Sequence, residues 1–333
     1  MQEMETKENQ IIHGVIWKQL LIFFFPILLG TFFQQIYNTA DTVVVGRFVG
    51  TEALAAVGGS TSQIINLIVG FFTGLASGAT VVISQHYGAK QEDGVQKALH
   101  TAYAFSVVGG IIISIMGILI TRPLLKLMNT PDNIIDLSAT YLCIYFAGLV
   151  FVFIYNVGAG ILRAVGDSRR PLYFLILCCF INVVLDIILI VFLKMGVAGA
   201  AIATTFSQGI SAVMVTVTLC RTTDIFRLRV KKIRFHAQPM GMIVKIGLPA
   251  GLQSVMYSLS NVIIQSSLNT FGTETVAAWT AFSKIDAIYW MISGAFGIAI
   301  TTCGSELWCR KIWTNEKERS CLPGNGYRCF DSD

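Results

Sequence analysis

The stretch PLYFLILCCFINVVLDIILIVFL, at residues 171–193, is apolar along its whole length and has one charged residue, Asp186. A helix of about 20 such residues spans the hydrocarbon core of a bilayer. Seven further stretches share this character, and short polar segments such as RAVGDSRRP separate them. The second of these stretches is longer than a span requires, so we expect it to be tilted or to extend out of the bilayer. The eight expected spans are 15–40, 53–84, 98–120, 137–160, 171–193, 197–220, 240–268 and 276–302.

The composition points to the same class of protein. Of the 333 residues, 54% are hydrophobic and 13% are charged, and the mean hydropathy is +0.67. Soluble domains are about 25% charged, so a soluble globular protein is excluded, as are coiled coil and collagen. The net charge of +5 resides in short loops and indicates no nucleic-acid partner. The eight cysteines form no C-x-x-C pair and indicate neither a disulfide framework nor a zinc site.

Lysine and arginine are distributed unequally between the two sets of loops. If the N-terminus is inside, the inner segments hold fourteen basic residues and the outer loops hold four, Arg47, Arg122, Lys126 and Lys194. Because inner loops are enriched in basic residues, we expect a cytoplasmic N-terminal tail at 1–14. This tail is polar and lacks the basic start and short apolar core of a signal peptide, so we expect no cleaved signal.

An internal repeat divides the chain. FVGTEALAAVG at 48–58 is similar to FGTETVAAWT at 271–280, and Pro26 matches Pro249. Six spans lie between equivalent points, so the two copies enter the membrane in the same direction, as a parallel repeat. The predicted fold is an all-α polytopic membrane protein with three main parts. These are a six-helix amino-terminal lobe at 15–220, a basic cytoplasmic linker at 221–239, and the first two helices of a carboxyl-terminal lobe at 240–302.

The last segment, 303–333, departs from the repeat. It is polar and holds four of the eight cysteines, whereas the repeat predicts a copy of VISQHYGAK (82–90) at this point. When residues from Cys303 onward are back-translated with free choice of codons, a second reading frame gives V-G-Q-N-F-G-A-G-K-Y, which is similar to the missing copy. We therefore interpret 303–333 as out-of-frame translation; the alternative is a natural soluble tail.

Ionisable side chains inside the spans are the main functional candidates. Each costs about 2.5–3.5 kcal/mol to insert, so such residues are functional candidates by default. Asp186 lies deep in its span, and Asn182 precedes it by one turn on the same helix face. The alternative is that this aspartate only hydrogen-bonds a neighbouring helix. The ionisable residues in or at the end of the spans that stand out are Asp41, Asp186, Lys284 and Asp286.

Asp41 closes the first span within QQIYNTADTVVVGR, and Tyr37 and Asn38 precede it by one turn on the same face. Thr204 and Thr205 in the sixth span offer hydroxyl groups, with helix packing as the alternative role. Two carboxylates with amide and hydroxyl oxygens suit a hard cation such as Na⁺, or a shared proton. The sequence therefore predicts a site for a coupling cation at the aspartate pair, and no other metal site.

Three further residues have two open interpretations each. Pro26 and Pro249 interrupt the hydrogen bonding of their helices and free backbone carbonyls. A hinge role and a plain packing role are about equally favoured for both prolines. Asp286 has either a structural or gating role or a contact with substrate.

Three motifs together resemble the multidrug and toxic compound extrusion family, MATE, over residues 10–302. They are YNTADTVVVGRFVGTEALAAVG (37–58), the Q-x-x-G-A-K end of the second span, and GILRAVGDSRRP (160–171). The resemblance implies twelve helices in two six-helix lobes, alternating access, and drug export driven by Na⁺ or H⁺. The family's cation site in the amino-terminal lobe resembles Asp41, Asn182 and Asp186 here, with Tyr37 and Thr205 or Thr204 nearby. In the second copy Ile264 falls near the place of Asp41, so the carboxylate pair belongs to the first lobe only.

The leading hypothesis is therefore a secondary transporter, not an enzyme: a cation-coupled antiporter that exports amphipathic, mostly cationic drugs by alternating access. We expect this sequence to be an incomplete chain of that transporter. A lipid-linked oligosaccharide flippase of the same superfamily, an inactive pseudogene product and, remotely, an intramembrane aspartyl protease are the alternatives. We expect a bacterial inner (plasma) membrane location, no cofactor beyond the coupling ion, contact with membrane lipid and no obligate protein partner. The residues expected to line a substrate cavity are Phe32, Phe33, Asn38 and Asp286.

Overall fold

The computed structural model describes residues 16–128, 130–269, 286 and 288–300, and the regular elements in these ranges are all helical. The expected tails at 1–14 and 303–333 lie outside the described residues, as does Lys284. The elements are α2 (Ile16–Phe48), α3 (Thr51–Gly58), α4 (Ser60–Gly88), α5 (Glu92–Leu127), α6 (Asp132–Ala164), α7 (Arg169–Asp186), the π-helix η1 (Ile187–Phe192), α8 (Gly196–Arg221), the 3₁₀-helix η2 (Val230–Lys232), α9 (Ala237–Asn269) and a helix at Ile288–Ile300.

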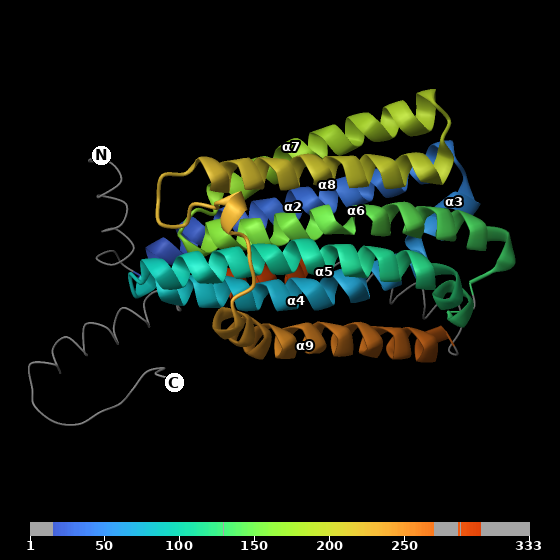
Figure 1. Ribbon diagram of the computed structural model, residues 1–333. Coiled ribbons are helices and arrows are strands. Elements are labelled where there is room, and N and C mark those ends of the chain that lie inside the picture. The colour runs from blue at the N-terminus through green and yellow to red at the C-terminus, as the bar shows by residue number, and fades with distance from the viewer. Residues whose placement is uncertain (1–15, 129, 270–285, 287, 301–333) are drawn as a thin grey trace, which may run out of the picture.

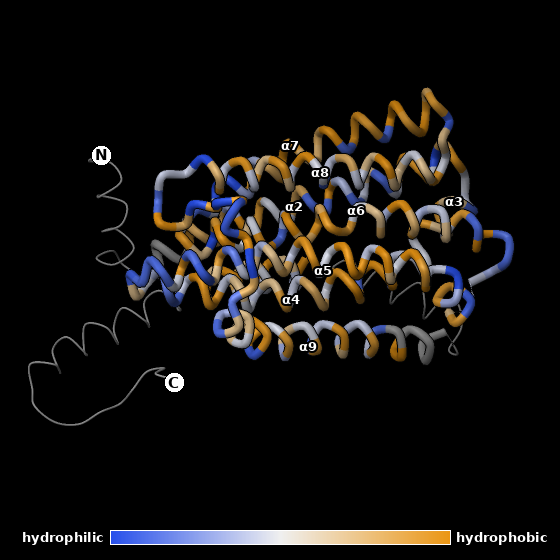
Figure 2. Tube along the Cα trace, in the orientation of Figure 1, coloured by the Kyte–Doolittle hydropathy of each residue, from blue (hydrophilic) through white to orange (hydrophobic). Residues whose placement is uncertain are grey.

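Seven helical segments among the described residues are long and apolar enough to cross a membrane. Polar residues gather at the two ends of the bundle and apolar residues fill the length between them (Figure 2). These features confirm the predicted all-α polytopic class. The eighth expected span, 276–302, is described only at Asp286 and over Ile288–Ile300. The seven segments are Leu21–Phe48, Thr51–Gly88, Glu92–Leu127, Asp132–Ala164, Arg169–Phe192, Gly196–Arg221 and Ala237–Asn261.

The second expected span, 53–84, is not one continuous helix, because two glycines set α3 off from the helices on either side of it. Gly50, with φ +120°, separates α2 from α3, and Gly59 interrupts the helix between α3 and α4. Gly50 adopts a backbone conformation that residues with a Cβ rarely adopt. The long apolar run is therefore a short helix followed by a spanning one.

The first six spans form one bundle with α6 at its centre. α6 packs against α4, α5 and α8, while α2, α7 and α8 pack against one another on the other side (Figure 1). Phe146 and Leu149 of α6 are fully buried in one of the apolar clusters that hold the bundle together. The bundle thus places α2, α7 and α8 around a common interior.

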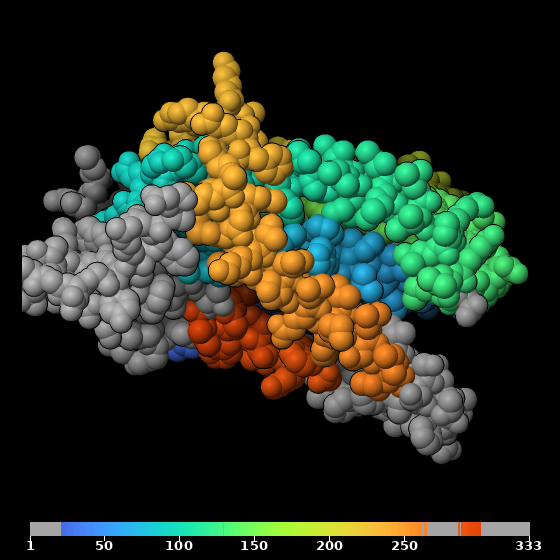
Figure 3. Space-filling view, turned by 60° about the horizontal axis from the view of Figure 1, so that its bottom comes forward, coloured from blue at the N-terminus to red at the C-terminus, as the bar shows by residue number. Residues whose placement is uncertain are grey.

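α9 lies along α4 with the two backbones in contact (Figures 1 and 3). Gly74 and Gly78 of α4 face Gly247 and Gly251 of α9. A Cβ atom built on Gly78 would lie 2.4 Å from the carbonyl oxygen of Ile243, so only glycine fits there. Small residues at helix crossings permit this close approach in membranes.

The helix at Ile288–Ile300 also contacts the first bundle. The rings of Phe24 and Phe296 stack with centroids 4.0 Å apart, which joins α2 to this helix. Tyr257 of α9 and Trp290 pack edge to face at 5.2 Å. Both described helices of the expected second lobe therefore touch the first lobe, one through α4 and one through α2.

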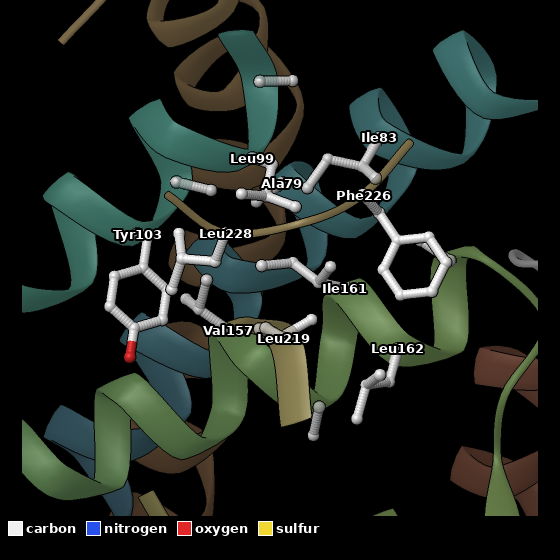
Figure 4. Close-up of a cluster of buried hydrophobic side chains, with 14 of the residues drawn as sticks. Ala79, Ile83, Leu99, Tyr103, Val157, Ile161, Leu162, Leu219, Phe226 and Leu228 are labelled. Atoms are coloured by element: carbon white, nitrogen blue, oxygen red, sulfur yellow. The ribbon is translucent and has the colours of Figure 1, made fainter. Parts of the chain in front are cut away.

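Residues 225–236, which we call the strap, fold back over one end of the bundle between α8 and α9. Phe226 and Leu228 point into the core, where they meet Leu99 and Leu219 among other apolar side chains (Figure 4). The basic linker expected at 221–239 is thus partly core, because its apolar residues alternate with its charges.

Candidate functional site

Two carboxylates meet in the interior of the bundle. Asp41 comes from the carboxyl-terminal half of α2, and Asp186 is the last residue of α7. Their exposed fractions are 5% and 0%, and the two carboxyl groups contact each other. The sequence predicted that both residues matter, and the structure brings them together.

Thr204 of α8 and Asn182 of α7 complete the group. Thr204 Oγ1 donates to Asp41 Oδ2 at 2.9 Å, and Asn182 Nδ2 reaches Thr204 Oγ1 at 3.5 Å. The Asn182 side chain also contacts the Asp41 carboxylate. The four residues are nearly or completely buried, so three helices share one buried polar cluster.

The cluster has more acceptors than donors. In the part of the chain that the structure describes, no donor reaches Asp41 Oδ1, Asn182 Oδ1 or either carboxylate oxygen of Asp186. Neither aspartate has a lysine or arginine partner among these residues. Burying a charged group without a partner is costly. The arrangement is therefore suited to accept a positive charge between the two carboxylates.

The backbone changes form directly after Asp186. The α-helix α7 gives way to the π-helix η1 at Ile187. π-Helical turns are rare and are frequently found at functional sites. No glycine or proline marks this change in the sequence INVVLDIILIVF (181–192), so the sequence did not predict it.

Three further side chains border the cluster. Gln208 Nε2 donates to the Tyr37 hydroxyl at 3.3 Å, and both residues are buried. Tyr141 of α6 lies close to Asp41. Sequence reasoning missed Gln208 and Tyr141. A signal existed for Gln208, which follows Thr204 by one turn on the same face of α8, whereas nothing distinguished Tyr141 from other aromatic residues.

The structure separates the two candidate threonines. Thr205 Oγ1 points toward α6 and reaches the Ile144 carbonyl oxygen at 3.4 Å, so Thr204 alone of the pair faces Asp41. The two prolines lie within helices: α2 continues through Pro26, and α9 continues through Pro249.

The residues expected to line a substrate cavity are exposed or partly exposed, unlike those of the carboxylate cluster. Phe32 is half exposed and packs edge to face with Phe33, and Asn38 is exposed. Asp286 Oδ2 accepts a hydrogen bond from Trp290 Nε1 at 3.0 Å. A small apolar hollow between α4, α5 and α6 is lined by other residues, including Phe72, Phe105 and Phe153.

The ligand set of the cluster defines what it can bind. No three His, Cys, Asp or Glu side chains come together among the described residues. Asp41, Asp186, Asn182 and Thr204 offer only oxygen atoms as ligands, apart from the amide nitrogen of Asn182. Oxygen ligands suit hard cations, and paired carboxylates can also share a proton.

Known proteins show the same organisation. The sequence model of the MatE family matches residues 26–188. The probable multidrug resistance protein YoeA of Bacillus subtilis (strain 168) is 30% identical over 328 residues, which cover 95% of this chain and 70% of YoeA. The multidrug export protein MepA of Staphylococcus aureus (strain MSSA476) is 24% identical over 280 residues, which cover 82% of this chain and 61% of MepA.

A solved structure has a similar fold. An outward-facing conformation of a multidrug resistance MATE family transporter of the MOP superfamily superposes with a TM-score of 0.84 at 26% identity. The superposition covers 94% of this chain and 69% of that one. The similarity therefore includes the helices that carry the buried carboxylates.

Proposed function

The chain belongs to the MatE family of multidrug transporters, and from this membership and its buried carboxylate pair we propose that it exports drugs as a cation-coupled antiporter. Members of this family are transporters rather than enzymes. The interpretation of Asp41 and Asp186 as the pair of an intramembrane protease is therefore wrong.

The observation that supports coupling is the set of oxygen atoms on Asp41, Asn182 and Asp186 that no donor among the described residues reaches. Two carboxylates in contact in an apolar interior repel each other unless a positive charge accompanies them. A proton or Na⁺ supplies that charge. Release of the cation leaves an unfavourable buried charge, so the site favours different packing of α2, α7 and α8 in its loaded and empty states.

Na⁺ and H⁺ place different demands on the same residues. For Na⁺, the oxygens of Asp41, Asp186, Asn182 and Thr204 act as ligands, as in other hard-cation sites. For H⁺, one proton is shared between the two carboxyl groups, and the amide and hydroxyl groups orient them. In both cases the Asp186 carboxylate changes partners during each cycle.

The helix α2 connects this site to the second lobe. Asp41 lies in its carboxyl-terminal half, and Phe24 in its other half stacks on Phe296. Pro26 lies between these two points and removes one backbone hydrogen bond from the helix. We assign Pro26 a hinge role, through which occupancy at Asp41 biases the contact between the lobes and drives alternating access.

The substrates follow from the relatives and from the coupling scheme. YoeA and MepA are described as multidrug resistance and multidrug export proteins. We propose amphipathic organic cations as substrates of this chain, because a cationic drug competes with the coupling ion for the same negative region. The protein lies in the plasma membrane with a cytoplasmic N-terminus, in agreement with the distribution of its basic loops.

Transport assays test this function. Ethidium efflux is measured from energised vesicles that carry the chain, with Na⁺ and pH gradients imposed separately. Asp41→Asn and Asp186→Asn should abolish gradient-driven efflux, because each removes a carboxylate that holds the coupling cation. Protein levels should stay normal, because a neutral amide is cheaper to insert into the membrane than a carboxylate. Asp132→Asn, at an exposed position at the start of α6, is the matched control and should keep the wild-type rate. Wild-type efflux in Asp186→Asn would contradict the proposal.

A further inference from the structure

The strap is fixed to α5 through its backbone. The Gln96 side-chain amide donates to the carbonyl oxygen of Ile225, and the Arg229 amide donates to His100 Nε2 at 3.1 Å. The His236 amide donates to Thr101 Oγ1 at 3.2 Å. Three α5 side chains, Gln96 and the adjacent pair His100 and Thr101 one turn later, therefore bind the strap, and each contacts at least one of its backbone groups.

Apolar residues anchor the inner side of the strap. Phe226 and Leu228 are 6% and 2% exposed in the core cluster, and Ile225 and Ile233 pack against the same cluster. The Leu228 amide also donates to the carbonyl oxygen of Leu219 in α8. The strap is thus held in one position on the bundle, with its inner side chains buried.

The outer side of the strap is basic and unneutralised. All five of its lysine and arginine side chains are exposed, and the structure shows no salt bridge to any of them among the described residues. The nearby Asp93 is already paired with Lys97 at 2.6 Å. The five basic residues are Arg227, Arg229, Lys231, Lys232 and Arg234.

Two large apolar side chains lie among these charges. Val230 and Phe235 are 64% and 50% exposed, although the same segment buries Phe226 and Leu228. The strap joins the ends of two membrane-spanning helices, α8 and α9, so it lies at the level where lipid headgroups begin. Basic residues interleaved with exposed apolar ones are typical of segments that bind the surface of an anionic membrane.

We propose that the strap is a docking surface for anionic phospholipid headgroups. The cations of Arg229, Lys231 and Lys232 face the phosphate groups, and Phe235 enters the boundary between headgroups and acyl chains. Because α5 already fixes the backbone of the strap, these side chains remain free to contact lipid. Little conformational entropy is therefore lost when lipid binds. This surface is separate from the carboxylate cluster and its function does not depend on transport.

Hydrogen exchange of the strap tests the proposal without any transport assay. The full chain is placed in phosphatidylcholine nanodiscs with a rising share of phosphatidylglycerol, and exchange is followed at the amides of residues 229–236. We expect phosphatidylglycerol to slow this exchange and high salt to reverse the effect. The variant Arg229→Gln/Lys231→Gln/Lys232→Gln should need at least about fivefold more phosphatidylglycerol to protect half of the strap amides. A fivefold change is the effect of losing about one basic charge near an anionic surface, so it is the minimum for three.

The matched control, Arg47→Gln/Lys126→Gln/Lys194→Gln, removes three exposed charges from the last turns of α2 and α5 and from the segment before α8. It should respond to phosphatidylglycerol as the wild type does. Inorganic phosphate alone should not protect the strap. The proposal is overturned if phosphatidylglycerol leaves wild-type exchange unchanged, if the control variant loses as much as the strap variant, or if phosphate protects equally well.

Discussion

Thr204 Oγ1 donates a 2.9 Å hydrogen bond to Asp41 Oδ2, whereas its neighbour Thr205 points to the Ile144 carbonyl oxygen on another helix. Of these two adjacent threonines, Thr204 thus belongs to the carboxylate cluster and Thr205 takes part in helix packing. The difference between them offers a sensitive test of the site, because one substitution can be made at both positions.

Thr204→Val should slow coupled efflux and lower the melting temperature, because it removes the hydroxyl that donates to the buried Asp41 carboxylate. Leaving such a group unsatisfied costs about 1–3 kcal/mol. Thr204→Ser should restore both properties. Thr205→Val serves as control and should behave as the wild type, since its bond to the Ile144 carbonyl is long at 3.4 Å. Equal effects of valine at the two positions would show that Thr204 only packs.

The seam between α4 and α9 gives a second prediction. Gly78→Ala places a Cβ atom 2.4 Å from the Ile243 carbonyl oxygen, so the two helices must separate. We expect a loss of about 1–3 kcal/mol, typical of overpacking, and weaker cross-linking between α4 and α9. Gly70→Ala, whose Cβ would lie 3.5 Å from Ser254, is the control on the same helix and should cost little. Tolerance of alanine at both positions would mean that the seam is looser than described.

His236 makes the strap sensitive to pH. Arg234 Nε donates to His236 Nε2 at 3.1 Å, so the other ring nitrogen carries the proton and meets Thr101 Oγ1 at 3.1 Å. Burial, and then the neighbouring Arg234, Lys97 and His100, lower the pKa of His236, while Asp93 opposes them.

The lowered pKa sets the direction of the pH effect. The strap is fully stabilised above the ordinary histidine pKa of about 6.5, and this contribution is lost as the pH falls below it. Protection of the strap amides, corrected for intrinsic exchange, should therefore decrease on acidification. His236→Gln should flatten this dependence, whereas His86→Gln, far from the strap in sequence and paired with Gln91, should not. An unchanged pH profile in His236→Gln would exclude this residue as the cause.

Much of the fold was predictable, because a bilayer demands long apolar helices and no other feature of the sequence competes with that pattern. The break at Gly59 was not predicted, since glycine is common inside membrane helices and one more glycine in an apolar run carries no special signal. The burial of Phe226 and Leu228 was also missed. In a segment this basic, charge dominates the pattern, and only tertiary contacts with α5 and α8 decide which apolar residues turn inward.

The sequence named the two aspartates, Asn182 and Tyr37 as members of the site, and it offered Thr204 and Thr205 together. Asp41 and Asp186 stand out because ionisable residues are rare inside spans. The sequence did not decide between Thr204 and Thr205, because adjacent residues on a helix point in directions that depend on its rotation about its own axis. The contact of Gln208 with Tyr37 joins two helices that are far apart in the sequence, and nothing in the sequence marks the π-helix after Asp186.

The central claim is that Asp41 and Asp186 together hold one exchangeable cation. Thermal unfolding of the purified chain across Na⁺ concentrations, with K⁺ as the balancing salt and at several pH values, tests it most directly. A cation that binds only the folded state raises the melting temperature with its concentration, so the wild type should be stabilised by Na⁺ or should show a pH dependence that Asp186→Asn removes. If the unfolding temperature responds to Na⁺ and pH identically in the wild type and in Asp186→Asn, the pair binds no cation and the account of coupling is contradicted.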